Sequence, residues 1–189
     1  MNDRMKILTS IPPKKLTITA IGAFLGIATA TLLAFYASVP LLLASLGSSA
    51  ALVYGAPDSP AAQPKRVIFG QFISALVSIS VCQILGFTWY SVAIAVALSV
   101  VAMLLTDTFH PPGSATAFTC VIVEANFAFA FVPVLLGSVI LVLWGLIIKR
   151  VTASLENKKT GNENAANENI IDGTTTSENI INETAANGK

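Results

Sequence analysis

The stretch Gly113-Ser114-Ala115-Thr116-Ala117 repeats an earlier one, Gly47-Ser48-Ser49-Ala50-Ala51, at an offset of 66 residues. Each copy is followed by a second match, Val67-Ile68-Phe69-Gly70 in the first half and Val134-Leu135-Leu136-Gly137 in the second, at an offset of 67 residues. Both pairs lie in strongly apolar sequence. An internal duplication in a membrane protein is typical of two pseudo-symmetric halves with the functional site between them. The repeat therefore favours a transporter or channel over an enzyme.

The composition around the repeat is that of an integral membrane protein. Hydrophobic residues make up 54% of the chain and charged residues only 11%, whereas soluble domains carry about a quarter charged residues. Cys82 and Cys120 lie inside apolar runs without a Cys-X-X-Cys motif or a neighbouring histidine, so we expect buried free thiols. A membrane-embedded enzyme would need convergent acid–base or metal ligands, and the chain offers one histidine. We expect no enzyme activity, no metal, no cofactor and no nucleic-acid partner.

Six apolar segments are predicted to be helices, three in each half of the chain. Four are long enough to span about 30 Å of hydrocarbon at about 1.5 Å per residue. The two shorter ones contain the repeated Gly-Ser motif. The long segments are Leu16–Tyr36, Val67–Phe87, Trp89–Leu105 and Phe127–Ile148, and the short ones are Leu41–Gly55 and Gly113–Val123.

The positive-inside rule gives the orientation of these segments. Lysines near the N-terminus and Lys149-Arg150 place both ends in the cytoplasm, so the number of crossings is even. If the short segments are re-entrant there are four crossings and Lys65-Arg66 falls outside; if they span there are six and Lys65-Arg66 falls inside. Six crossings fit the rule better. The predicted fold is an all-α integral membrane protein with six apolar helical segments, four long and two short, arranged as a 3+3 inverted repeat.

Three regions are predicted along the chain: a cytoplasmic N-terminal segment at 1–14, a transmembrane domain at 15–150 and a tail at 151–189. The tail is rich in Asn, Glu, Thr and Ala and has no aromatic residue. It cannot bury enough apolar surface to offset its ordering entropy, so we expect a disordered cytoplasmic tail. We expect the protein in the bacterial inner (plasma) membrane, in contact with the lipid bilayer.

Small residues recur at the spacing of helix-packing stripes. Gly22 and Gly26 begin one stripe, Gly47 and Gly55 belong to a second, and Gly70 begins a third. Such stripes let helix backbones approach closely in lipid. They are also compatible with a homo-oligomer.

The two Gly-Ser motifs are the candidate solute site. Pro111 and Pro112 end the preceding helix and suit the first turn of a new one, and Pro40 precedes Gly47 in a similar way. A helix start leaves backbone N–H groups without partners and carries partial positive charge, so it binds small anions. In an inverted repeat two such starts meet near the bilayer midplane. The predicted anion-binding residues are Gly47, Ser48, Ser49, Gly113, Ser114 and Thr116; the alternative is that their hydroxyls only cap their own helices.

Four further positions have two interpretations each. Asp107 and His110 lie in a connection, either as solvated turn residues or as a gating group that accompanies an anion, with His110 titrating near neutral pH. Lys65 and Arg66 follow a proline-rich connector, where they either attract an anion or bind lipid headgroups and fix the topology.

Two motifs carry a resemblance to a known family. Phe109-His110-Pro111-Pro112-Gly113-Ser114-Ala115, together with the Ala56–Pro64 segment, resembles the HPP family of integral membrane proteins, named for its His-Pro-Pro motif. The resemblance covers roughly Lys15 to Ile148 and implies a compact membrane domain usually described as having four helices, so our count of six departs from it. Cyanobacterial and chloroplast members are implicated in nitrite transport, so the resemblance implies a small-anion substrate.

We therefore predict a transporter or channel for a small inorganic anion, with nitrite as the first candidate. The alternative is a non-transporting membrane partner or assembly protein that acts through its tail.

Overall fold

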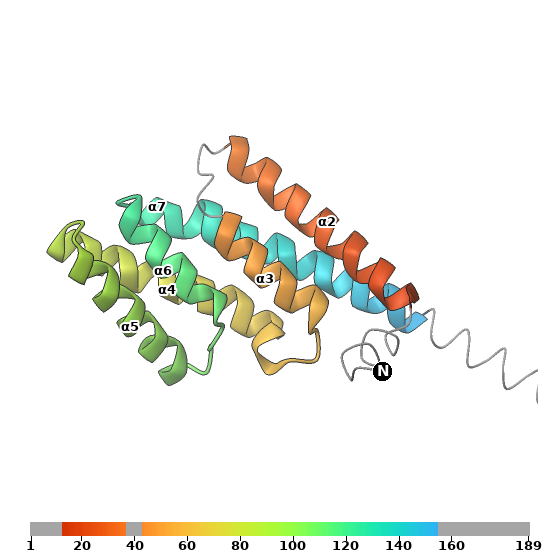
Figure 1. The fold of residues 1–189 in the computed structure, drawn as a ribbon. Coiled ribbons are helices and arrows are strands. Elements are labelled where there is room, and N and C mark those ends of the chain that lie inside the picture. The colour runs from red at the N-terminus through yellow and green to blue at the C-terminus, as the bar shows by residue number, and fades with distance from the viewer. Residues whose placement is uncertain (1–12, 37–42, 155–189) are drawn as a thin grey trace, which may run out of the picture. The chain divides into compact units, whose positions relative to one another are not determined.

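The computed structural model describes residues 13–36 and 43–154, and every regular element in those two ranges is a helix (Figure 1). The chain divides into two compact units, Met1–Ile148 and Lys149–Lys189, and the fold that follows is that of the first. Its elements are α2 (Pro13–Tyr36), α3 (Leu43–Gly55), the 3₁₀ turn η2 (Pro60–Ala62), α4 (Pro64–Leu85), α5 (Trp89–Leu105), α6 (Pro112–Ile122), α7 (Phe127–Phe129) and the π-helical η3 (Ala130–Leu135), after which the helix continues. The helix continues to Ser154, so the tail predicted to begin at 151 is helical over its first four residues; residues 155–189 and the first 12 residues lie outside the described ranges.

All six predicted segments are confirmed as helices, and their ends have local causes. Pro64 and Pro112 stand in the first turns of α4 and α6, where a missing N–H leaves no hydrogen bond unmade. Gly86 ends α4 with a positive φ of 69°. Thr88 and Ser91 then form a reciprocal capping box that starts α5.

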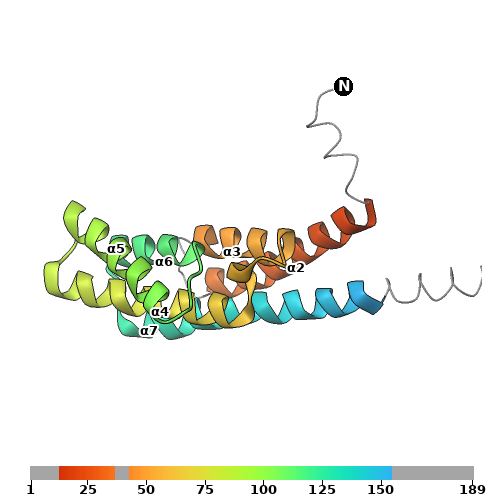
Figure 2. The ribbon, with the colours of Figure 1, turned by 90° about the horizontal axis from the view of Figure 1, so that it is seen from below.

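The helices lie in two layers, seen most clearly from below in Figure 2. One layer holds α5, α6, α3 and α2, and the other holds α4 and the helix that begins at α7. Helix α4 packs against α5, α6 and η3, while α3 packs against α2 and α6. The larger cluster of buried apolar side chains includes Leu46, Val67, Ile79, Val134 and Leu141.

Two helical runs are long and apolar enough to cross a membrane, Pro64–Leu85 and Phe127–Ser154. Helix α6 has 11 residues, which extend only about 16 Å at 1.5 Å per residue. It runs parallel to α4, because Gly113 at its start lies against Gly70 and Val121 near its end accepts a weak hydrogen bond from Cys82. Within the described residues, α3 and α6 are each a single unbroken helix.

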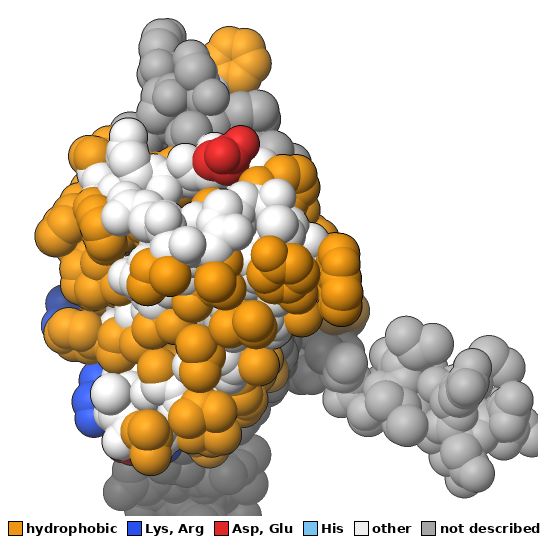
Figure 3. Space-filling view, turned by 90° about the vertical axis from the view of Figure 1, so that its left-hand side faces the viewer, with side chains coloured by type: hydrophobic (Ala, Val, Ile, Leu, Met, Phe, Trp, Pro, Cys, Tyr) orange, Lys and Arg blue, Asp and Glu red, His pale blue; other side chains and the backbone are white. Residues whose placement is uncertain are grey.

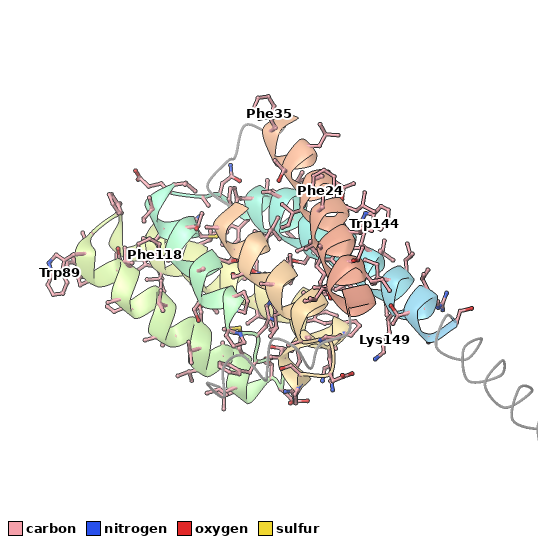
Figure 4. All side chains as sticks on the ribbon, turned by 45° about the vertical axis from the view of Figure 1, so that its right-hand side comes forward. Phe24, Phe35, Trp89, Phe118, Trp144 and Lys149 are labelled. Atoms are coloured by element: carbon pink, nitrogen blue, oxygen red, sulfur yellow. The ribbon has the colours of Figure 1, made fainter. Side chains whose placement is uncertain are left out.

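The surface is apolar, as expected for a protein in lipid. Hydrophobic side chains cover most of the face in Figure 3. Phe24, Phe35 and Trp89 point away from the bundle in Figure 4 and are 72%, 78% and 84% exposed. A soluble protein rarely exposes so many large apolar side chains.

The glycine stripes divide into two kinds. At Gly26 an added Cβ would overlap the Tyr54 ring, and at Gly70 it would lie 2.5 Å from the Thr108 carbonyl oxygen and 2.8 Å from Cβ of His110. Close packing is confirmed at these positions. At Gly47 and Gly55 no atom of the described residues lies within 4 Å of such a Cβ, so the structure shows no close packing at these two positions.

Candidate functional site

The His-Pro-Pro segment connects α5 to α6 and places His110 in the interior of the protein. Helix α6 begins at Pro112, as predicted from the two prolines. His110, two residues earlier, is fully buried, so its interpretation as a solvated turn residue is wrong. Its Cβ packs against α4 at Gly70, and its ring lies between η2 and α3.

The His110 ring makes two hydrogen bonds that fix its tautomer. Nδ1 lies 2.8 Å from the carbonyl oxygen of Ala61, and Nε2 lies 2.9 Å from Oγ of Ser49. A carbonyl oxygen can only accept, so Nδ1 carries the hydrogen. In the neutral ring Nε2 is then an acceptor, and the Ser49 hydroxyl donates to it.

Gln71 of α4 lies at the centre of the surrounding polar groups and is fully buried. Its Nε2 donates to Oγ of Ser49 at 2.7 Å and to Oγ of Ser45 at 2.9 Å. Its Oε1 accepts from the hydroxyl of Thr116. Ser45 in turn donates to the carbonyl oxygen of Pro112 at 3.0 Å. We call the five side chains Ser45, Ser49, Gln71, His110 and Thr116 the polar cluster.

Every polar hydrogen of the polar cluster is donated to an acceptor. Because Ser49 gives its one hydrogen to His110, the Gln71 atom that faces Ser49 must be the NH₂ group, and Oε1 must face Thr116. Among the described residues, no buried side-chain nitrogen or oxygen lacks a partner. A fully satisfied network of this kind specifies one arrangement of the helices around it. The cluster joins α3, α4, α6 and η2 without a formal charge.

Burial lowers the pKa of His110 below its ordinary value of 6.5, and the hydrogen bond to Ala61 partly opposes this. Above pH 6.5 the imidazole is neutral in both the folded and the unfolded chain, so it adds no pH dependence. Below it the unfolded chain takes up a proton that the folded chain excludes. We therefore expect the unfolding temperature in detergent to fall as the pH is lowered from about 6.5 toward the depressed folded pKa. In His110→Gln this part of the pH dependence should disappear; an unchanged profile would contradict the assignment.

The first Gly-Ser motif does not start a helix, contrary to the prediction. Helix α3 begins by Leu43, so Gly47 lies in its second turn. Ser48 is exposed and its hydroxyl donates to the carbonyl oxygen of Ser45 one turn earlier, at 2.9 Å. Of this motif only Ser49 reaches the polar cluster.

The second motif does start a helix, but its first N–H groups are already used. The Gly113 N–H donates to the His110 carbonyl oxygen at 2.8 Å, and the Ser114 N–H donates to that of Pro111 at 3.0 Å. Ser114 is half-buried, and Thr116 is the hydroxyl of this motif that enters the cluster. The opposed pair of free helix starts expected from the repeat is therefore wrong, whereas Ser49, His110 and Thr116 do come together.

Lys65 and Arg66 lie in the first turn of α4 and pair with Asp107. Nη2 of Arg66 lies 2.7 Å from Oδ1 of Asp107, and Nζ of Lys65 lies 3.5 Å from Oδ2. Asp107 is 71% exposed at its side chain, so these ion pairs contribute only about 0–1 kcal/mol each. They connect the start of α4 to the segment that carries His110.

Two members of the polar cluster, Ser45 and Gln71, were not predicted. Gln71 had a usable signal, since it is one of two amides in an apolar membrane segment and lies in its first half, where a polar side chain needs a partner. Ser45 had none. Among the described residues, no three His, Cys, Asp or Glu side chains gather as metal ligands.

A bundle of apolar helices with an apolar exterior and a satisfied polar cluster inside is an integral membrane protein. The chain belongs to the HPP family: the family model for the HPP transmembrane region matches residues 8–158. It is similar to two transmembrane proteins of Dictyostelium discoideum. The first is 38% identical over 142 residues, covering 69% of this chain and 50% of the relative, and the second 37% over 140 residues, covering 68% and 45%. The chain thus spans about half the length of these curated relatives. No solved structure matches it.

Proposed function

We propose that this protein is a transporter or channel for a small inorganic anion, with nitrite as the first substrate to test, and that the anion passes through the polar cluster. The observation that carries the proposal is the cluster itself. Buried polar side chains in a membrane protein are costly and mark solute pathways. Five of them meet here, on three helices and one connection, in a bundle whose other buried residues are largely apolar.

The chemistry of the cluster supports a small solute with oxygen acceptors. The hydroxyl groups of Ser45 and Thr116, which donate to Pro112 and Gln71 in this conformation, can donate to a solute instead, and no fixed charge in the cluster would retain a tightly bound ion. Nitrite is small, planar and singly charged, with two acceptor oxygens. These hydroxyls replace the free helix starts expected from the sequence as the proposed binding groups.

The 3+3 inverted repeat forms part of the same proposal. Supporting it, Gly70 of the first half packs against the start of α6, and the matching Gly137 of the second half packs against Leu46 of α3. The matching position to Gln71 is Ser138, whose hydroxyl donates to Val134 within its own helix. In this proposal the anion pathway lies beside Gln71 and not beside Ser138, the matching position of the second half. The protein lies in an inner or plasma membrane with both termini cytoplasmic, as the positive-inside rule favours.

The test is nitrite uptake into proteoliposomes with a matched pair of variants on α6. Thr116→Val removes the hydroxyl that donates to Gln71, whereas Thr119→Val removes one that donates only to Ala115 in its own helix. We expect Thr116→Val to lower the uptake rate at least about tenfold, since about 1.4 kcal/mol lost from binding in the pathway is a factor of ten. Thr119→Val should transport like the wild type.

Protein-free liposomes run alongside, because nitrous acid crosses bare lipid. Nitrate, formate and chloride test which anion is preferred. No uptake of any anion by folded wild-type protein would overturn the proposal, and equal losses in the two variants would overturn the pathway through Thr116.

A further inference from the structure

The carboxamide of Gln71 has the size and shape of a small planar solute. Its O–C–N group is held by three hydroxyls, those of Ser45, Ser49 and Thr116, and the side chain is fully buried. If the Gln71 side chain moved away, these hydroxyls would line a cradle for a planar molecule of three heavy atoms. Formamide, formate and nitrite are such molecules.

The neutral His110 ring makes this cradle unsymmetrical. On one side the Thr116 hydroxyl donates to Gln71, and the Ser45 hydrogen, which donates to Pro112 while Gln71 is in place, can turn to Oε1 of Gln71, 3.1 Å from Ser45 Oγ, so both hydrogens can point into the cradle. On the other side the hydrogen of Ser49 is committed to Nε2 of His110, so Ser49 presents only lone pairs. An amide fits this arrangement, because it accepts on one side and donates on the other. An anion does not, because one of its oxygens would face the Ser49 lone pairs.

Protonation of His110 reverses the direction of its hydrogen bond with Ser49. Nε2 then carries a hydrogen and donates to Oγ of Ser49, so the Ser49 hydrogen turns away from the ring and toward the cradle. That hydrogen then points at the NH₂ group of Gln71, whose Nε2 lies 2.7 Å from Oγ of Ser49. Two hydrogens face each other, so the hydrogen bond from Gln71 to Ser49 is weakened. The same hydrogen can donate to an anion in the cradle.

We infer that Gln71 occupies the solute position in this conformation, and that an anion replaces it only together with one proton bound to Nε2 of His110. One anion and one proton enter the site together, and the proton, taken from water, forms an N–H bond on Nε2. This bond breaks again when the proton and the anion leave on the other side. Transport is therefore electroneutral. This inference rests on the proposed anion transport. It adds Gln71 as the residue that closes the site and Ser49 as the group through which the proton is sensed.

The imidazole is the group in the cluster that can take up this proton. The ionisable residues on the elements packed against it are Asp58 before η2, Tyr54 of α3, Lys65, Arg66 and Cys82 of α4, Asp107 of its own connection, and Cys120 of α6. Lys65 and Arg66 both pair with Asp107, and the Tyr54 hydroxyl donates to the carbonyl oxygen of Leu141. The ring's two nitrogens bond to Ala61 and Ser49.

The cradle is tested with Gln71→Ala in detergent, by the shift in unfolding temperature with formamide, sodium formate, sodium nitrite and sodium chloride between about pH 5.5 and 8. We expect formamide to stabilise this variant at every pH. Formate and nitrite should stabilise it with an apparent affinity that falls about tenfold per pH unit, because one proton is bound with the anion. Chloride is a single atom and cannot contact both sides of the cradle, so it should give the smallest shift in unfolding temperature. Gln83→Ala, at an exposed glutamine of the same helix, is the control: Gln71 still occupies the cradle in it, so the probes should shift its unfolding temperature no more than that of the wild type.

The double variant Gln71→Ala with His110→Gln tests whether His110 binds the proton that accompanies the anion. Glutamine at 110 can still accept from Ser49 but cannot be protonated, so formamide should still bind while the pH-dependent binding of formate and nitrite is lost. A pH slope that persists in the double variant would overturn the role of His110. No stabilisation of Gln71→Ala by any of the planar probes would overturn the cradle. If alanine yields no folded protein, Gln71→Asn, which withdraws the amide by one methylene, carries the same comparison.

The outcomes separate this inference from the proposed function. Nitrite uptake by the wild type without any binding to the cradle leaves transport standing and overturns the inference. Probe binding to the cradle without uptake of any anion by the wild type overturns transport. In transporting proteoliposomes, entrapped pH dye should report one proton entering per nitrite, and a charge-carrying uptake would also overturn the inference.

Discussion

Gly70→Val is expected to lower the free energy of unfolding by about 3 kcal/mol or more, the upper end of the range for overpacking in a tight core. A Cβ at this position would lie 2.5 Å from the Thr108 carbonyl oxygen and 2.8 Å from Cβ of His110. The Thr108 oxygen belongs to the backbone, so it cannot turn aside as a flexible side chain could. The connection that carries His110 would have to move away from α4. We therefore expect the variant to lose nitrite uptake as well as stability, measured by thermal unfolding in detergent and by uptake into proteoliposomes.

Gly47→Val is the matched control for this substitution. Gly47 also lies inside a helix, but no atom of the residues that the structure describes lies within 4 Å of an added Cβ there. Valine has a helix propensity slightly better than that of glycine, so stability should change by less than about 0.5 kcal/mol. Equal losses in the two variants would show that valine harms these helices wherever it is placed, and the contact with the His110 connection would then not explain the effect.

The course of the helices follows from local sequence. Long apolar segments, and prolines at 64 and 112, were enough to predict the helices and the start of α6. The start predicted at Gly47 failed for a physical reason. Gly-Ser-Ser favours a helix end in water, but inside a membrane helix a serine hydroxyl bonds back to a carbonyl of the preceding turn, as Ser48 does to Ser45. The helix therefore runs through the motif.

The site was only partly predictable, since it depends on how three helices are rotated about their axes. The repeat and the His-Pro-Pro motif identified Ser49, His110 and Thr116. Gln71 comes from α4, and its position opposite the other three is set by the packing of Gly70 against the α5–α6 connection. That contact joins residues about 40 positions apart in the chain, and nothing local to either segment specifies it.

His110→Leu is expected to lower the free energy of unfolding by about 2–4 kcal/mol, because each buried group left without its hydrogen-bond partner costs about 1–3 kcal/mol. Leucine fills much of the same volume but neither donates nor accepts. The Ala61 carbonyl oxygen and the Ser49 hydroxyl would each lose a hydrogen bond, of 2.8 and 2.9 Å. Chemical unfolding in detergent measures the change. Transport should be lost too, since η2 and α3 are joined through this ring.

His110→Asn separates the two hydrogen bonds. The asparagine amide can donate to Ala61 in place of Nδ1, but it is too short to accept from Ser49 as Nε2 does. We expect its loss of stability to be about half that of the leucine variant, since one of two partners is kept. If asparagine is as damaging as leucine, the bond to Ala61 contributes nothing. If it equals the wild type in both stability and uptake, Ser49 needs no acceptor at position 110, and the direction of hydrogen bonding through Gln71 would have to be set by other groups.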